Sequence, residues 1–230
     1  MTTSTVTTWS YRPLKAVTTK IGSGATPRGG KNSYKEEGIA LVRSLNIHDL
    51  EFRYANLARI DEVQASLLSG VEVRAGDVLL NITGASIARC ASIPSAALPA
   101  RVNQHVSILR PKPELIDSQF LTYYLVSPEA KTQLLDTGNK AGATRQALTK
   151  GQLETFPAPI PPLDEQKRIV SVLDQAFAAL DRARDHAEAN LADSNNFRVL
   201  PRFHGRFEKV RKLTVLPCDS APHSRIVKSL

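Results

Sequence analysis

The most regular pattern of apolar and polar positions lies late in the chain, from Pro161 to Asn196. Taken in alternating steps of three and four, its positions are Leu163, Gln166, Val170, Leu173, Phe177, Leu180, Arg184, Ala187, Leu191 and Ser194. A seven-residue repeat sustained in this way follows the 3.5-residue period of a coiled coil. The pattern predicts one helix over residues 161–196, roughly 50 Å long at about 1.5 Å per residue.

The start of this helix carries its own signals. Pro161 and Pro162 can end a strand without breaking a following helix, and Asp164 and Glu165 place negative charge on the first-turn amides. The helix either packs along its own domain or pairs with another helix. Its predicted length exceeds the roughly 11–12 residues of a typical globular helix, which favours pairing with a second copy or another protein. The expected helix-pairing residues are Leu163, Val170, Leu173, Phe177, Leu180 and Leu191.

The preceding residues change between strand and helix signals over short distances. Strand patterns occupy Gly38–Ser44, Val71–Val73 paired with Asp77–Thr83, Leu79–Cys90 as strand, turn and strand, Val102–Arg110, and the proline-rich Phe156–Ile160. Helices are expected over residues 57–68, after Asp117 or Ser118, after Ser127, and from near Thr149. These signals predict an α+β fold. A compact mixed α/β domain (residues 1–160) would be followed by one long protruding coiled-coil-type helix (161–196) and a disordered tail (197–230).

Composition adds a charge pattern to this picture. Residues 1–160 hold 18 Lys/Arg against 13 Asp/Glu, a net charge of +5, whereas residues 161–196 hold 4 against 7 and carry −3. Residues 197–230 hold 8 against 2, which gives +6. Basic surface favours a polyanionic partner, although +5 over a domain is weak support by itself. No apolar run approaches the roughly 18 residues that span a bilayer, and Met1–Thr5 lacks a signal-peptide pattern.

The residue types exclude several chemistries. Cys90 and Cys218 lie far apart and neither belongs to a Cys-x-x-Cys pair, so we expect a cytoplasmic protein without disulfides or zinc. The glycine-rich stretch Gly22–Lys31 is not a Walker A sequence and is equally compatible with a surface turn. His105 is either a metal ligand or general base, or a hydrogen-bonded structural or DNA-facing residue, and its lack of nearby ligands favours the latter. We find no cofactor-binding or nucleophile motif, and predict a non-catalytic chain without a cofactor.

Five segments resemble one half of the DNA-specificity subunit of type I restriction–modification enzymes. They are Gly22–Pro27, Gly76–Gly84, Val102–Val106, Gly142–Arg145 and, above all, Pro161–Val170, and the resemblance spans about residues 9–196. It implies a target-recognition domain followed by a spacer helix. A full-length subunit of this family carries the unit twice and pairs its helices antiparallel. Each domain reads half of an interrupted DNA sequence, and methylation and restriction subunits dock on the assembly and supply the catalysis.

The chain departs from that family pattern by showing one such domain and one helix. Two copies could restore the layout by pairing their helices with two-fold symmetry, which predicts two inverted, identical half-sites. The alternative is an inactive or regulatory remnant that binds the modification subunit or DNA without supporting activity.

The resemblance gives the polar loop residues candidate roles in binding double-stranded DNA. Positive charges on loops suit phosphate contacts, and we assign these to Lys31, Lys140 and Arg145. Arginine suits guanine, while asparagine and glutamine suit adenine in the major groove. The candidates for base contacts are Arg43, Asn46, Ser86, Arg89, Asn103, Gln104 and Gln146. Each could equally be a solvent-exposed loop residue.

Overall fold

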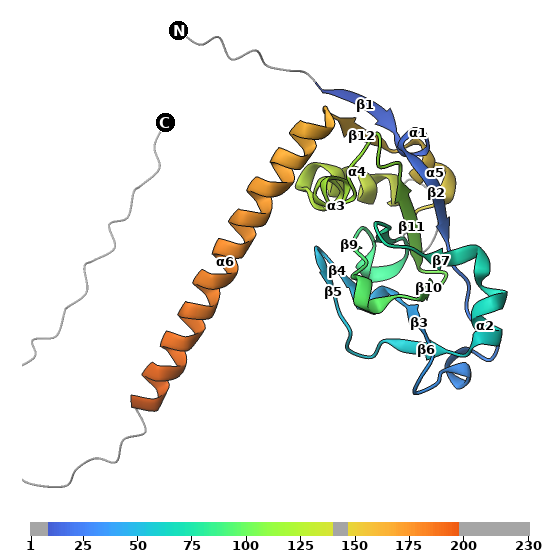
Figure 1. Ribbon diagram of the computed structural model, residues 1–230, viewed down its shortest axis with the longest axis horizontal. Helices are drawn as coiled ribbons and strands as arrows, with labels where there is room; N and C mark the ends of the chain where they lie inside the picture. Colours follow the sequence, from blue (N-terminus) through green and yellow to red (C-terminus); the bar gives the residue numbers. More distant parts are fainter. Residues whose placement is uncertain (1–8, 140–146, 198–230) are drawn as a thin grey trace, which may run out of the picture. The chain divides into compact units, whose positions relative to one another are not determined.

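Two four-stranded sheets lie at the centre of the domain (Figure 1). The computed structural model describes residues 9–139 and 147–197. The first sheet has the order β6 (Ala58–Ile60), β3 (Ile39–Val42), β10 (Ala100–Val102) and β7 (Glu72–Val73). The second has the order β2 (Thr18–Ser23), β11 (Val106–Pro111), β8 (Val78–Asn81) and β9 (Cys90–Ser92). Within these sheets β3 and β10 are parallel, and the other pairs are antiparallel.

Strands β3 and β8 are apolar on both faces because each of them packs into two cores. In β8, Val78 and Leu80 belong to the core beneath the helices, whereas Leu79 belongs to the core between the two sheets. In β3, Val42 joins the core between the sheets and Leu41 faces the opposite way. Successive side chains of a strand point to opposite faces, so these continuous apolar runs build three cores from two sheets.

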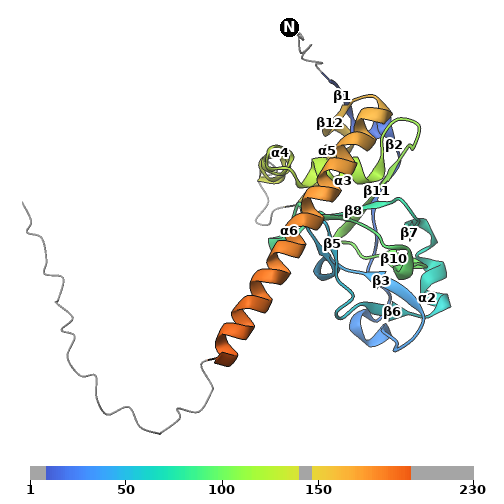
Figure 2. The same ribbon diagram turned by 60° about the vertical axis from the view of Figure 1, so that its left-hand side comes forward.

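Helices close the outer faces of this arrangement (Figure 2). The second sheet is covered by α3 (Ser118–Val126), α4 (Pro128–Asn139), α5 (Lys150–Thr155) and the first turns of α6 (Leu163–Phe197). The short α2 (Glu62–Leu67) covers the first sheet, where Ala65 packs near Leu41 and Ile60. The order of layers is helices, sheet, sheet and helix.

Smaller elements complete the described chain. The strand β1 (Ser10–Pro13) pairs with β12 (Pro157–Ile160), and β4 (Ile47–His48) pairs with β5 (Glu51–Phe52). A single helical turn, α1 (Leu14–Val17), joins β1 to β2. The 3₁₀ turns are η1 (Gly30–Ser33), η2 (Ser44–Asn46), η3 (Ser69–Val71), η4 (Gly84–Ser86) and η5 (Ser95–Ala97).

The predicted starts of α3 and α5 agree with the structure because side-chain caps mark them. The Asp117 carboxylate accepts hydrogen bonds from the backbone N–H groups of Gln119 and Phe120, both at 2.9 Å. Thr149 and Gln152 form a reciprocal capping box at the start of α5. The expected edge strand after Phe156 is β12.

Two predictions are wrong where the chain crosses from one sheet to the other, and one predicted helix is shorter than expected. The stretch Val102–Arg110 is not one strand but β10 and β11, which lie in different sheets. Val71–Val73 and Asp77–Thr83 do not pair, since β7 joins β10 while β8 joins β11 and β9. The helix expected over residues 57–68 begins only at Glu62, where Asp61 caps it, and Ala58–Ile60 pair with β3.

The long helix α6 is confirmed, at 35 residues, and with it the α+β fold. The first compact unit of the chain ends at Leu180, within α6, and the described residues of α6 from Asp181 belong to a second unit. The boundary at residue 160 therefore stays a prediction. The expected tail beyond Phe197 lies outside the described residues. In the described ranges no helix is long and apolar enough to cross a membrane.

Candidate functional site

The turn between β10 and β11 organises a corner of the domain where several polar side chains meet. The Asn103 side-chain oxygen accepts a hydrogen bond from the His105 backbone N–H at 3.0 Å, an Asx turn that reverses the chain. The Asn103 backbone N–H donates to the Val42 carbonyl, also at 3.0 Å. This turn leaves Gln104 exposed and His105 half-buried.

A chain of four side chains runs across this corner. The Thr26 hydroxyl donates to the Gln104 side-chain oxygen at 2.5 Å, and the Gln104 amide lies 3.0 Å from His105 Nε2. His105 Nδ1 lies 2.6 Å from the Thr83 hydroxyl oxygen. With the imidazole neutral, an amide donor at Nε2 places the ring hydrogen on Nδ1, which donates to Thr83. The Thr83 hydroxyl hydrogen is then available to an acceptor outside the chain of four.

The glycine-rich loop is fixed against the same turn. The Gly24 backbone N–H donates to the Asn103 carbonyl at 3.1 Å. A Cβ atom at Gly24 would lie 1.6 Å from the Val102 carbonyl oxygen. Only glycine permits so close an approach of two backbones, so Gly24 is needed to bring Thr26 to Gln104.

The segment after Gly142–Arg145 reaches the same corner from the other side. Ala147 forms an antiparallel bridge with Thr83, and the Leu148 N–H donates to the Ile82 carbonyl at 2.8 Å. Three of the segments singled out in the sequence, Gly22–Pro27, Gly76–Gly84 and Val102–Val106, thus meet in one place, although they lie far apart along the chain. Gly142–Arg145 lies outside the described residues.

A groove with a volume of about 460 Å³ opens beside this corner. It is lined by residues of η2, of η4 and the segment after it, and of the β10–β11 turn: Ser44, Leu45, Thr83, Gly84, Ala85, Ser86, Arg89 and His105. Arg89 supplies its positive charge, with Nη1 at 3.5 Å from His48 Nδ1. The groove therefore combines hydroxyl, imidazole and guanidinium groups with an apolar wall.

Backbone strain accompanies the presentation of Arg89. The preceding residue Ala88 is buried and has a φ of +66°, a left-handed conformation that costs a residue with a Cβ about 1–2 kcal/mol. Its N–H donates to the Asn81 carbonyl, and the Asn81 N–H donates to the Arg89 carbonyl, both at 2.9 Å. Such strain persists where surrounding contacts enforce it, and it is concentrated at functional sites.

Two buried asparagines hold the η2 wall of the groove. Asn46 Nδ2 donates to the Arg53 carbonyl at 2.9 Å and the Ala55 carbonyl at 3.2 Å, and its Oδ1 accepts from the Arg43 N–H at 3.1 Å. Asn81 Nδ2 donates to the Ser44 carbonyl at 2.9 Å. Both asparagine side chains are fully buried, so both act on the shape of the groove from below.

The sequence-predicted site residues occupy different environments. Ser86 and Arg89 line the groove, and Gln104 belongs to the chain of hydrogen bonds at its edge. Asn46 and Asn103 are buried; both ends of the Asn46 side chain are bonded to backbone groups, and the Asn103 side-chain oxygen is bonded to the His105 N–H. Lys140, Arg145 and Gln146 lie outside the described residues.

The two remaining candidates, Arg43 and Lys31, do not line the groove. Arg43 precedes η2, stacks 5.2 Å above the Tyr34 ring, and donates through Nη2 to the Asn56 carbonyl. Lys31 is exposed on η1. The sequence pattern indicated no DNA contact for Thr26, Leu45 or Thr83. Thr26 and Thr83 nevertheless lie inside the segments Gly22–Pro27 and Gly76–Gly84.

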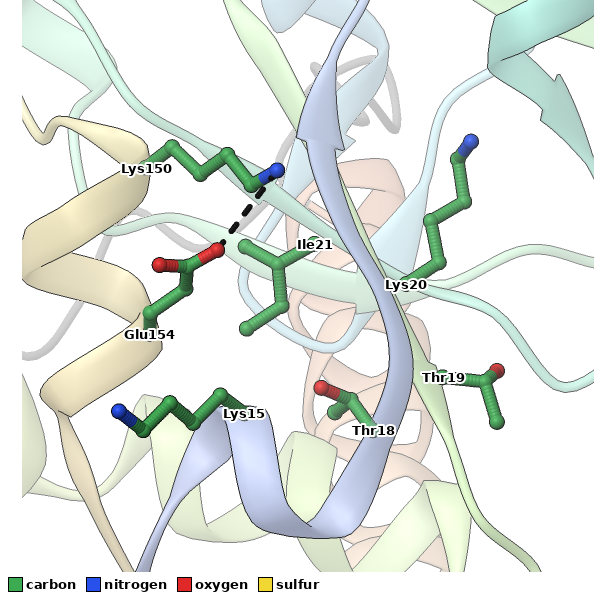
Figure 3. A pocket seen from close by; sticks show the side chains of 7 residues that line it. All are labelled: Lys15, Thr18, Thr19, Lys20, Ile21, Lys150 and Glu154. Carbon is green, nitrogen blue, oxygen red and sulfur yellow. Dashed lines mark ion pairs between the residues drawn. The ribbon is translucent and has the colours of Figure 1, made fainter.

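A second concavity, of about 340 Å³, lies between α1, β2 and α5 and is shown in Figure 3. Lys150 forms an ion pair with Glu154 at 3.6 Å, and the Lys20 ammonium donates to the Gly70 carbonyl at 2.5 Å. In Figure 3 Lys20 lies across the β2 ribbon from Lys150, so the lysines do not converge on one point. No group of three His, Cys, Asp or Glu residues within the described ranges could hold a metal ion.

The first turns of α6 are fixed to the domain. Gln166 is fully buried, and its side chain accepts from the Asp117 N–H at 2.7 Å and donates to the Leu115 and Pro161 carbonyls at 3.0 and 2.8 Å. Further along, Tyr123 donates to Asp174 and stacks on Phe177 with ring centroids 5.7 Å apart. Burial and the Asp174 carboxylate raise the pKa of Tyr123.

The predicted helix-pairing residues divide along α6. Val170 packs on the domain core, Phe177 contacts Tyr123, and Leu163 and Leu173 are half-buried. Leu180 and Leu191 are 64% and 65% exposed. The first half of the seam thus has a partner in its own domain, while the second half offers large apolar side chains to solvent.

The described chain thus combines a two-sheet domain that carries a groove with a long helix that carries an apolar seam. The model of the type I restriction modification DNA specificity domain matches residues 9–188. The chain belongs to this family, and the resemblance seen in the sequence is confirmed.

Individual relatives agree with this assignment. The specificity subunit of the type I restriction enzyme EcoBI from Escherichia coli is 29% identical over 161 residues, which are 70% of this chain and 33% of that protein. The crystal structure of the HsdS subunit from Thermoanaerobacter tengcongensis is 28% identical with a TM-score of 0.56, covering 80% of this chain and 41% of the other. A chain from a structure of type I R-M complex assembly is equally similar, with a TM-score of 0.57 and 43% coverage. The chain therefore spans less than half the length of these relatives.

Proposed function

We propose that this chain is a sequence-specific DNA-recognition subunit of a type I restriction–modification system and reads one half of a bipartite target. The observation that carries the proposal is the meeting of three separate segments, Gly22–Pro27, Gly76–Gly84 and Val102–Val106, beside one groove. Hydrogen bonds between side chains of Thr26, Gln104, His105 and Thr83 hold that meeting in place. A preorganised set of donors and acceptors, with a cation beside it, is what base reading requires.

Within the groove, Arg89 and Ser86 are suited to base edges and Gln104 to the adjacent base pair. Arginine recognises guanine through O6 and N7, and glutamine recognises adenine through N6 and N7. Lys31, together with Lys140 and Arg145 outside the described residues, would bind phosphates and position the duplex. Arg43 would act from the edge of the groove, because its guanidinium is already bonded to Asn56. We leave Asn46 and Asn103 out of the interface because both are buried.

Selection of bound sequences from random duplexes tests this assignment. Arg89→Ala should lose preference at one base position by about 5- to 150-fold, corresponding to about 1–3 kcal/mol for a bidentate contact. Arg59→Ala is the matched control, since Arg59 is exposed on β6 and bonded to the Gly38 carbonyl at 2.8 Å. If Arg89→Ala and Arg59→Ala select the same sequence as the unmodified chain, the groove does not read bases.

The second half of α6 would provide the pairing surface. Leu180 and Leu191 are exposed on the heptad seam, and an antiparallel partner helix would bury them. The partner would be a second copy or another half-subunit of the same system. Methylation and restriction subunits would dock on the resulting assembly and perform the chemistry, so the chain itself would be non-catalytic.

Light scattering after size exclusion tests pairing between copies. Leu180→Lys and Leu191→Lys should each convert a dimeric mass to a monomeric one. Val172→Lys should not, because Val172 is 53% exposed but lies off the seam. A monomeric unmodified chain would rule out self-pairing. If copies do pair, methylation should occur at symmetric bipartite sites, and methylation at asymmetric sites alone would contradict the model.

A further inference from the structure

Leu45 is exposed although the structure fixes its position. It is 43% exposed at the centre of η2 and lines the groove together with Ala85 and Gly84. Single exposed leucines are ordinary on protein surfaces. This one differs because it forms the apolar part of a groove whose other lining groups are hydroxyls, an imidazole and a guanidinium.

The backbone that carries Leu45 is held from both sides. Ser44 precedes it, and its carbonyl accepts a hydrogen bond from Asn81 Nδ2 at 2.9 Å. Asn46 follows it, and its buried side chain bonds to three backbone groups. The 3₁₀ turn between these two anchors has little freedom to retract the leucine.

The arrangement of Asn81 also carries a cost in stability. Its Oδ1 is buried and has no hydrogen-bond partner among the described residues. An unpaired buried acceptor costs about 1–3 kcal/mol. An apolar residue would avoid that cost but could not hold the Ser44 carbonyl. The presence of an asparagine at position 81 is therefore better explained by its hydrogen bond to η2, which fixes the position of that turn, than by a gain in stability.

A ligand for this wall must offer a small apolar group surrounded by polar ones. In the major groove of DNA, the edge of a base pair offers one such group, the methyl on C5 of thymine. The guanidinium of Arg89 and the hydroxyls of Ser86 and Thr83 would face the neighbouring hydrogen-bonding atoms and phosphates. An apolar protein surface would leave these polar groups unpaired.

We propose that Leu45 contacts the C5-methyl group of a thymine in the recognised half-site, so that the chain distinguishes thymine from the same base without its methyl. The inference rests on the proposed function, because it names one chemical group of the DNA that the groove would read.

The test replaces thymine by deoxyuridine, one position at a time, in the duplex selected by the full chain. This substitution removes the methyl and leaves the base pairing intact. Burial of one methyl is equivalent to about a fourfold change in affinity. At one thymine the unmodified chain should therefore bind the deoxyuridine duplex about fourfold more weakly. Leu45→Ala should bind the thymine duplex more weakly and bind both duplexes equally.

Leu67→Ala is the control, since Leu67 is 60% exposed on α2 and does not line the groove. It should keep the fourfold difference. If deoxyuridine is tolerated at every position, or Leu45→Ala retains the difference, the inference is wrong while the proposed function stands. If Leu45→Ala changes only binding to the methylation subunit, Leu45 contacts a protein and the inference is again wrong. If the unmodified chain selects no sequence at all, the proposed function itself fails.

Discussion

Replacement of Gln166 by leucine should loosen the attachment of α6 to the domain more than any other single change on that helix. The side chain is fully buried and makes three hydrogen bonds, to the Asp117 N–H and to the Leu115 and Pro161 carbonyls. Leucine has a similar volume, so little of the loss would come from a cavity.

The expected loss follows from those bonds. Each contributes about 1 kcal/mol, and a backbone group left buried without a partner adds further cost. Gln166→Leu should therefore lower the free energy of unfolding by about 3–5 kcal/mol, a large part of the roughly 5–15 kcal/mol of a typical domain. Asp117 also caps α3, so the loss would extend to the start of that helix.

Urea unfolding followed by Trp9 fluorescence measures the effect. The midpoint should fall with little change in slope. Gln175→Leu is the matched control, because Gln175 is exposed on the same helix and its Nε2 lies 3.3 Å from the Ser171 hydroxyl. It should change the stability by less than about 0.5 kcal/mol. Equal midpoints for the two variants would refute the view that buried hydrogen bonds fix α6 to the domain.

Three further predictions concern the domain itself. Gly24→Ala should displace the glycine-rich loop and weaken DNA binding, because the new Cβ would lie 1.6 Å from the Val102 carbonyl oxygen. Gly22→Ala should bind DNA normally, since no atom lies within 4 Å of its new Cβ. Equal DNA affinities of the two variants would contradict the docking of the loop. Asp77→Ala should lower the free energy of unfolding, measured in urea, by about 3–5 kcal/mol. Asp77 is fully buried and forms a bidentate ion pair with Arg110 at 2.7 and 2.8 Å. A loss below about 1 kcal/mol would show that the pair behaves as an exposed one. Burial raises the pKa of Tyr124 to about 12, so its contribution to stability should be complete below pH ~10. That contribution should be lost as the pH rises from there through the folded-state pKa of about 12. Tyr124→Phe should flatten this alkaline decline, and an unchanged decline would contradict the assignment.

The features that could be predicted from the sequence are those set by neighbouring residues. The heptad seam gives α6 to within a few residues of its ends. Asp117 and Thr149 mark helix starts because their side chains accept hydrogen bonds from amides two or three positions later. Local hydrogen bonding of this kind is visible in sequence spacing.

The crossings between the two sheets could not be predicted in this way. Val102, Val106 and Ile108 keep the same alternation on both sides of the turn, so the pattern continues while the chain changes sheets. The strand ends at Asn103, whose side-chain oxygen accepts a hydrogen bond from the backbone N–H of His105, two residues later. The same residue type thus serves a structural purpose here, and a base contact by Asn103 stays a prediction.

The groove itself depends on contacts between distant segments. Thr26 and Gln104 lie far apart in sequence, as do Asn81 and Ser44, and no local spacing indicates that they meet. Burial separates Asn46 from Gln104, although both are polar loop residues in the sequence. Residue type indicated DNA contact for both, and only the folded chain shows which one is exposed.

Sequencing of methyl marks on random DNA, left by this chain together with the methylation subunit of its own system, tests the central claim most directly. The account predicts that every mark lies within one bipartite sequence, and that Arg89→Ala relaxes one base of it. Marks without a common sequence, or no marks from an assembled complex, would contradict the claim that this chain reads DNA.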